Sequence, residues 1–479
     1  MSSPSTLTAP SANHLTADRR WTLALASVGS FLVILDLFAV TTALPTLRVA
    51  LHASIATLDW TINAYTLSFA VLLMTAAALA DRFGRRRVYA SGILLFAVSS
   101  AACALAPNGA VLIAARAVQG IGAAVTMPTA LALINAAFPA QRRGWAQGVF
   151  GAVTGLATVL GPVVGGAITQ VLSWSYIFWI NIPIGVAAAV AVLLRIREGQ
   201  PDRPGGRRAP DLLGLVLGGV SVLALVGGVV RAAADGWGDW AVAGSLGLGG
   251  AAVVALLAWQ RRASTPLIPL RLFTDRAFAS GIAGIFLQSA SLTALVFFTA
   301  QFFQGAESDS PLAAGLRLLP LGLVPLALGP RSGTSTDRVG TRPMIVAGMA
   351  LQTVGTAILA VFSRPGLWYP ILAVAMAVVA VGFTFAVPAL TKSVVGSVEP
   401  ADISTASGLF STVRQVGAAF GVAVASAAFT ATGGYTAASA VASGYHAAMM
   451  VAAVLAGLGT ATTTMSRRKA HKARSVLGG

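Results

Sequence analysis

Asp36 is the residue of this sequence most able to carry chemistry. It lies in the apolar stretch FLVILDLFAVTTALP, residues 31–45, and of the fifteen acidic residues it is the one well inside a predicted membrane span. A carboxylate at membrane depth costs about 2.5–3.5 kcal/mol on insertion scales, so it normally faces a bundle interior or a wet cavity. We therefore predict a proton-binding site. The alternative is a structural Asp bonded to a neighbouring helix.

Arg116 is the candidate partner of Asp36. Asp36 lies fifteen residues into its predicted span, or about 22 Å along the helix axis and past the membrane midplane. Arg116 lies about seven residues from the outer start of another span. Burial favours a neutral carboxyl group, and a nearby arginine favours a charged one. Asp36 could therefore take up and release a proton as its surroundings change. An arginine that snorkels to the interface is the alternative.

The composition places these two residues in a polytopic membrane protein. The chain is 56% hydrophobic and 10% charged, whereas soluble domains carry about 25% charged residues. It has one cysteine and four scattered histidines, so we expect neither an intramolecular disulfide nor a metal site. Because regular helices satisfy their own backbone hydrogen bonds, we expect an all-α bundle.

Fourteen stretches are long enough to cross a bilayer, for which about 20 apolar residues are needed. They cover residues 21–44, 58–80, 88–106, 110–137, 145–171, 175–194, 211–231, 241–259, 277–303, 312–330, 343–362, 368–391, 405–430 and 443–464.

The positions of Lys and Arg predict the topology. With the N-terminus inside, 26 of the 32 basic residues lie in inside segments, 3 lie outside and 3 lie within spans. Basic residues accumulate in cytoplasmic loops, so we expect a multi-pass protein of the cell membrane with both termini in the cytoplasm. This distribution also accounts for the net charge of +17 without a nucleic-acid partner.

Two internal matches divide the bundle. The sequence DRFGRR at 81–86 returns as DRVGTR at 337–342, and AxGxF at 146–150 returns at 406–410. The offsets of 256 and 260 residues both correspond to eight spans, so spans one to six match spans nine to fourteen. Repeated halves with a site between them are typical of transporters.

The predicted organisation follows from this repeat. It consists of a cytoplasmic tail 1–20, a six-helix bundle 21–194, a linker 195–210, two inserted helices 211–259, a second linker 260–276, a second six-helix bundle 277–464 and a basic tail 465–479.

Six segments together carry a family resemblance: residues 35–45, 77–86, 116–124, 161–166, 178–185 and 406–417. In this order and register the chain resembles the major facilitator superfamily, specifically its fourteen-helix drug–proton antiporter family. It departs from the family's usual pattern at Thr41, Ala77 and Ala157, where Asn, Gly and Gly are common. The resemblance implies two six-helix bundles with two inserted helices.

The resemblance also assigns roles to residues. It implies proton coupling at Asp36 and Arg116. The gating residues are Asp81, Arg82, Gly84 and Asp337, and the antiporter motif is formed by Gly151, Gly155, Gly161, Pro162, Gly165 and Gly166. The glycine spacing also fits close helix packing alone. Polar residues inside spans are candidates to line a substrate cavity: Asn63, Tyr65, Gln119, Asn181, Gln288, Gln301 and Arg414. For Arg414, a structural role is equally open.

The function that the resemblance implies is proton-driven efflux of amphipathic drugs, antibiotics or secondary metabolites by alternating access. The expected partners are a small-molecule substrate, protons and the lipid bilayer, and the superfamily suggests a monomer. No ATPase cassette is present, so we expect no cofactor and a proton gradient as the energy source. A proton-linked transporter of an endogenous metabolite or lipid is the alternative. A membrane sensor or enzyme on this scaffold fits less well, because clustered catalytic residues are lacking.

Overall fold

The structure is a computed structural model that describes residues 17–196, 211–264, 266–362, 364–399 and 402–465. Within these residues the regular elements are all helical. The helices are α1 (Ala17–Ala50), α2 (Ile55–Phe83), α3 (Arg85–Ala104), α4 (Gly109–Ala137), α5 (Ala140–Val171), α6 (Tyr176–Trp179), α7 (Asn181–Arg195), α8 (Leu212–Asp235), α9 (Trp240–Gln260), η1 (Leu270–Thr274), α10 (Arg276–Gly305), α11 (Pro311–Arg317), α12 (Pro320–Val339), α13 (Thr341–Phe362), α14 (Tyr369–Val395), α15 (Ile403–Thr432) and α16 (Ala438–Met465).

Every predicted span overlaps a helix or a broken pair of helices, which confirms the all-helical membrane fold. Among the described residues, twelve helices are long and apolar enough to cross a membrane, and the pair Pro311–Arg317 and Pro320–Gly329, bent by 40°, makes up to thirteen. Helix α2 has 29 residues, but the apolar stretch found within it, Trp60–Leu73, is too short to be counted as a membrane span. The number fourteen therefore stays a prediction.

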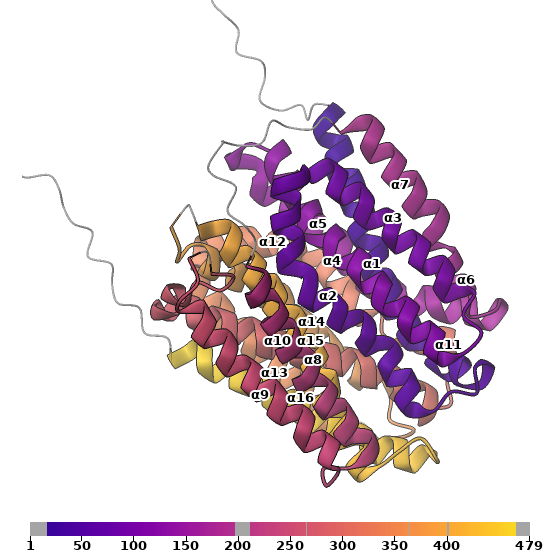
Figure 1. Cartoon of the computed structure of the whole chain (residues 1–479). Helices are drawn as coiled ribbons and strands as arrows, with labels where there is room; N and C mark the ends of the chain where they lie inside the picture. Colours follow the sequence, from indigo (N-terminus) through magenta and orange to yellow (C-terminus); the bar gives the residue numbers. More distant parts are fainter. Residues whose placement is uncertain (1–16, 197–210, 265, 363, 400–401, 466–479) are drawn as a thin grey trace, which may run out of the picture.

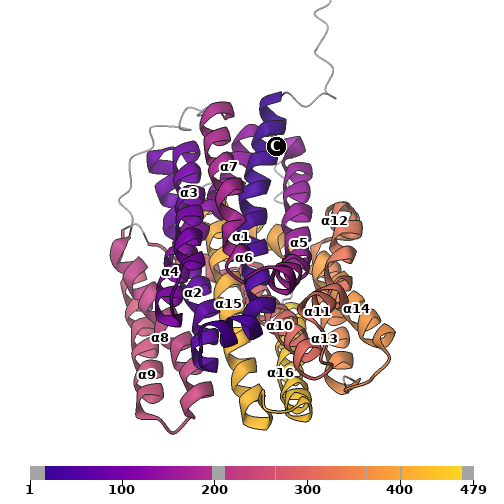
Figure 2. The same ribbon diagram turned by 90° about the vertical axis from the view of Figure 1, so that its right-hand side faces the viewer.

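Two groups of helices form the bundle. Helices α1–α7, indigo to purple, gather on one side, and α10–α16, salmon to yellow, gather on the other (Figure 1). Helices α8 and α9, which the sequence predicts to be an insertion, pack together along one flank, where α8 contacts both α2 and α15 (Figure 2).

Gly84 and Gly340 occupy equivalent places in the two groups. Gly84 joins α2 to α3 with φ +93°, and Gly340 joins α12 to α13 with φ +97°. Each amide donates a hydrogen bond of 3.1 Å to the carbonyl four residues earlier. Glycine adopts positive φ without the steric cost that a Cβ adds, so this tight helix junction needs it. The shared geometry supports the predicted repeat.

The two groups share their main apolar core at one end of the described bundle, and α2, α8 and α15 share a smaller one. We call the end with the main core the far end; α1 finishes there, opposite the terminal end that carries Ala17 and Met465. The far-end core combines Val40 of α1 with Phe298 of α10 and Phe429 of α15. Toward the terminal end, separate cores form within α10–α16 and within α1–α7. The bundle is thus sealed across its halves at the far end.

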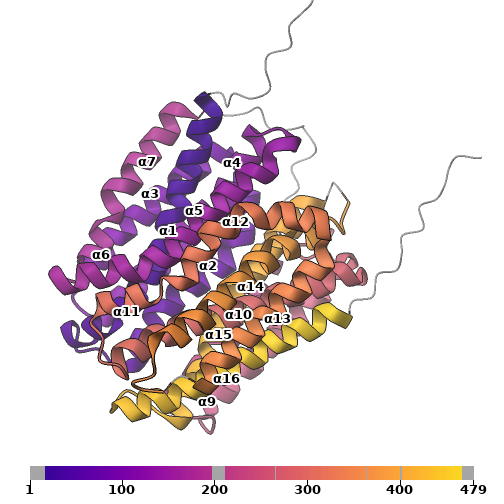
Figure 3. The ribbon, with the colours of Figure 1, turned by 180° about the vertical axis from the view of Figure 1, so that it is seen from behind.

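Helices α5 and α11 form part of this seal. They lie side by side at the far end (Figure 3). A Cβ on Gly315 would stand 2.6 Å from the carbonyl oxygen of Pro162, and a Cβ on Gly166 would overlap the carbonyl oxygen of Pro311. The two backbones can approach this closely only because both positions lack side chains.

Asp211 ties α8 and α9 together at the terminal end. It caps α8 by accepting a 2.8 Å hydrogen bond from the amide of Gly214, and it accepts bonds of 2.7 and 2.8 Å from Trp259 Nε1 and Gln260 Nε2 of α9. Burial alone would raise the pKa of Asp211, but these hydrogen bonds together lower it below its ordinary value. The charged carboxylate therefore stabilises the α8–α9 pair.

We expect Asp211→Ala to lower the free energy of unfolding by about 1–3 kcal/mol, because a helix cap and charge-assisted hydrogen bonds are lost. Asp211→Asn, which keeps a capping oxygen, should lose less. A depressed pKa contributes stability above the unfolded-state pKa of about 3.9 and loses it as the pH falls, so the wild-type advantage should be full at neutrality and shrink in acid. Denaturant titration of the purified protein at several pH values tests this. Equal stability of all three proteins would contradict it.

Candidate functional site

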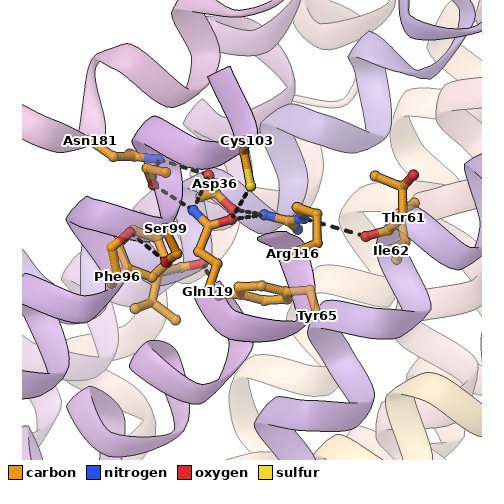
Figure 4. A network of polar contacts seen from close by, with 12 residues as sticks. Asp36, Thr61, Ile62, Tyr65, Phe96, Ser99, Cys103, Arg116, Gln119 and Asn181 are labelled. Carbon is orange, nitrogen blue, oxygen red and sulfur yellow. Dashed lines mark hydrogen bonds and ion pairs between the residues drawn. The ribbon is translucent and has the colours of Figure 1, made fainter. Parts of the chain in front are cut away.

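A buried ion pair joins α1 to α4. Arg116 Nη1 donates to Asp36 Oδ2, and neither side chain has any exposed surface (Figure 4). The structure thus brings together the two residues that the sequence singled out. Removing one partner of such a pair costs about 3–5 kcal/mol, because the remaining charge stays buried without compensation.

Two amides complete the shell of the Asp36 carboxylate. Its Oδ1 accepts hydrogen bonds of 2.7 Å from Asn181 Nδ2 and 3.1 Å from Gln119 Nε2. The same two amide groups also reach Ser100 Oγ, at 3.3 and 2.6 Å. Hydrogen bonds to a carboxylate are stronger than bonds between neutral groups, so this shell holds the Asp36 side chain firmly beside Arg116.

Arg116 has contacts beyond Asp36. Its Nη1 donates to Gln119 Oε1 at 2.6 Å, and its Nε donates to the carbonyl of Thr61 at 3.3 Å. The guanidinium carbon lies 4.2 Å from the centre of the Tyr65 ring, within the range of a cation–π interaction. Its Nη2 is buried without a hydrogen-bond partner in the described structure. The Nη2 amino group is therefore unused, while Nε and Nη1 of the guanidinium donate to groups of α1, α2 and α4.

Glycines in α4 place Arg116 and Gln119 at this site. A Cβ on Gly120 would overlap the carbonyl oxygen of Tyr65 in α2. A Cβ on Gly122 would stand 2.6 Å from the amide of Phe96 in α3. The segment 116–124 thus combines the polar residues of the site with the small residues that let α4 lie against α2 and α3.

The residues of the predicted antiporter motif divide into three sets. Gly161 and Gly165 face α1 beside Asp36: a Cβ on Gly161 would lie 2.6 Å from Phe38 Cβ, and a Cβ on Gly165 would overlap the carbonyl oxygen of Ala39. Gly166 and Pro162 face α11, as described above. In contrast, a Cβ on Gly151 meets nothing within 4 Å, and one on Gly155 meets only Pro325 Cβ at 3.8 Å.

Three of the predicted cavity residues lie at the ion pair. Gln119 and Asn181 contact Asp36 and have no exposed surface, and Tyr65 lies against Arg116 while its hydroxyl donates to the carbonyl of Val33 at 3.0 Å. The structure places these residues around the ion pair, and their role in lining a substrate cavity stays a prediction.

The remaining candidates are dispersed. Gln288 donates to Gln352 Oε1 at 3.2 Å within α10–α16, and Asn63 and Gln301 are buried. Arg414 lies in α15. The side chains of the gating residues Asp81, Arg82 and Asp337 fall outside the described part of the structure.

Sequence reasoning missed Ser100, Thr61 and Cys103. Ser100 bridges the two amides, Thr61 contributes only its backbone carbonyl, and Cys103 Sγ lies 3.6 Å from Gln119 Oε1. A carbonyl contact leaves no mark on residue type, and a serine or cysteine within a helix is common. No sequence signal distinguished them.

We expect Asn181→Ala to lower the free energy of unfolding by about 1–3 kcal/mol, because it removes a hydrogen bond to a buried charge. The loss should be smaller in an Asp36→Asn background, where that charge is absent. Denaturant titrations of the wild type, both single variants and the double variant form a double-mutant cycle that isolates the coupling. Strict additivity of the two changes would show that the 2.7 Å contact is not energetically significant.

Comparison with known proteins agrees with this geometry. The family model described as Major Facilitator Superfamily matches residues 26–422. The chain is 34% identical over 414 residues to the tetracenomycin C resistance and export protein of Streptomyces glaucescens, covering 85% of this chain and 75% of the relative. It is 36% identical over 405 residues to the cephamycin export protein CmcT of Amycolatopsis lactamdurans, covering 84% and 83%.

Among solved structures, the fold matches a bacterial homolog to the human lysosomal transporter Spinster in an inward-facing and unoccupied conformation. The TM-score is 0.67 at 17% identity, and the match covers 95% of this chain and 98% of the other. At this identity the likeness concerns the fold alone.

Proposed function

The chain belongs to the Major Facilitator Superfamily of membrane transporters, and we propose that it exports amphipathic drugs, antibiotics or secondary metabolites in exchange for protons. It is a transporter and not an enzyme. Relatives named for the export of tetracenomycin C and cephamycin support the efflux of such compounds.

The buried Asp36–Arg116 pair is the observation that carries proton coupling. The charges balance each other while Asp36 is ionised. A proton on Asp36 would leave Arg116 buried and uncompensated, which is unfavourable by several kcal/mol. The protein can accept the proton only if Arg116 gains other partners or moves. Protonation and helix rearrangement are thereby linked, as alternating access requires.

The sealed far end supports the direction of transport. In the topology that the basic residues predict, the terminal end is cytoplasmic and the far end is external. The two helix groups share a core at the far end, and each has a core of its own toward the terminal end. We therefore assign this structure to a state that is open to the cytoplasm. We propose that substrate enters in this state. Proton entry from outside then favours release after the far end opens, and loss of the proton inside resets the cycle. We place the transporter in the cell membrane as a monomer.

Inverted membrane vesicles from cells with and without the protein test this proposal. An acidic lumen should drive accumulation of lipophilic dyes and antibiotics, and a protonophore should abolish it. Cells that carry the protein should also tolerate the accumulated compounds better. If no compound of a broad panel is moved or tolerated, an endogenous metabolite becomes the better substrate. If accumulation persists after the pH gradient is collapsed, proton coupling is wrong.

A further inference from the structure

Arg414 is a cation within a membrane-spanning helix that lacks a counter-ion among the described residues. It lies in α15 and is half-buried, and its Nε atom is buried without a hydrogen-bond partner. No ion pair or hydrogen bond of its guanidinium is found in the described part of the chain. The other two span arginines differ: Arg116 pairs with Asp36, and Arg317 Nε lies 3.1 Å from Asp309 Oδ2.

The position of Arg414 relative to the far-end core is informative. On α15, the far-end core begins at Val422, about two turns beyond Arg414. Gly417, one turn from Arg414 and on the same side of the helix, presses against α10: a Cβ there would stand 3.0 Å from Phe286 Cα. Ala419 belongs instead to a core shared with α2 and α8. Arg414 therefore lies at membrane depth on the terminal side of the far-end core, on the side of α15 that faces α10.

An arginine in this position is suited to an anionic ligand. Leaving a cation at membrane depth without a partner is unfavourable, so intramembrane charges are normally paired. The guanidinium fork matches a carboxylate through two parallel hydrogen bonds, which a lysine ammonium cannot reproduce. A ligand that brings its own carboxylate would supply the missing negative charge.

We propose that Arg414 binds the carboxylate of an amphipathic organic acid, which makes such acids a substrate class of this transporter. The inference rests on the proposed function and names one substrate class for it. In the proposed complex the carboxylate of the ligand pairs with the Arg414 guanidinium. Asp36 remains paired with Arg116 in this loading state, so the charge of the ligand is met by Arg414 alone.

Binding of two matched probes tests this. A diethylaminocoumarin carboxylic acid and its carboxamide share one ring system and differ in charge. Their affinities are measured by fluorescence with purified protein in nanodiscs of zwitterionic lipid, without a pH gradient. The proteins are the wild type, Arg414→Met, Arg414→Lys and Arg262→Met. The last is the control, because it removes an exposed positive charge from the loop after α9.

We expect the wild type to prefer the acid, and Arg414→Met to weaken acid binding about tenfold or more while changing amide binding less than about twofold. Arg414→Lys should retain part of the preference, and Arg262→Met should match the wild type. Unchanged acid binding in Arg414→Met, or an equal loss of both probes, would overturn the inference. So would displacement of Arg414-dependent binding by added anionic lipid, which would identify a lipid-headgroup contact.

The outcome is separable from that of the proposed function. Acid binding through Arg414 without pH-driven movement of any probe would uphold the carboxylate site at Arg414 and refute proton-coupled export. Gradient-driven export of the neutral amide, with no Arg414-dependent preference for the acid, would do the reverse.

Discussion

Asp36→Asn should reduce pH-driven export by at least about a hundredfold, because an asparagine can neither take up nor release the coupling proton. Substrate binding without a gradient should persist, since Asp36 lies in a shell that is closed within α1, α4 and α7. Vesicle transport and equilibrium binding of the same dye, measured side by side, separate the two effects. Normal export by the variant, with the same dependence on pH, would make Asp36 structural.

The same variant should also be less stable. A neutral asparagine in place of Asp36 would leave Arg116 as an unpaired buried charge, at a cost of about 3–5 kcal/mol. Adding Arg116→Gln should recover part of this loss without restoring coupling. The double variant is therefore the control that distinguishes a coupling defect from a folding defect: it should be more stable than Asp36→Asn and equally unable to use the gradient.

Gly166→Ala should shift the transporter away from the state with a sealed far end. The added Cβ would overlap the carbonyl oxygen of Pro311, so α5 and α11 could not approach as they do here. Overpacking of this kind costs about 1–3 kcal/mol, and this cost falls on the sealed state alone. Ala314 in α11 has no exposed surface, so a cysteine introduced by Ala314→Cys should react faster with a membrane-impermeant maleimide when Gly166→Ala is also present.

Gly151→Ala is the matched control, because the same substitution on the same helix meets nothing within 4 Å. It should leave the labelling rate and export unchanged. Equal labelling rates in the Gly166→Ala and Gly151→Ala backgrounds would mean that the α5–α11 contact does not determine closure of the far end.

The helices and the central ion pair were predictable from the sequence for physical reasons. A membrane requires long apolar helices, so the spans are evident in composition alone. Within the predicted spans, Asp36 is the one deeply placed acid, so a buried arginine at a similar depth is a natural partner. The break between α11 and α12 is not evident in the sequence: residues 312–330 predict one span, although Pro320 begins α12 and marks the bend.

The rest of the site depends on tertiary packing. Asn181 is 145 residues from Asp36 in sequence, and it reaches the carboxylate because α7 begins beside α1. The sequence assigns Gln119 to a substrate cavity because a polar residue in a span fits either role. Only the packing of α4 against α2 and α3 turns it toward Asp36, and that packing depends on the backbone approach at Gly120 and Gly122. Residue type alone carries neither fact.

Proton movement during substrate transport tests the central claim most directly. Proteoliposomes with an acidic lumen and an enclosed pH-sensitive dye would receive a transported substrate from outside. The account predicts that the lumen becomes more alkaline when substrate is added to wild-type vesicles, and that it does not in vesicles with Asp36→Asn. Substrate entry without a change in luminal pH in the wild type, or an equal change in the variant, would contradict it.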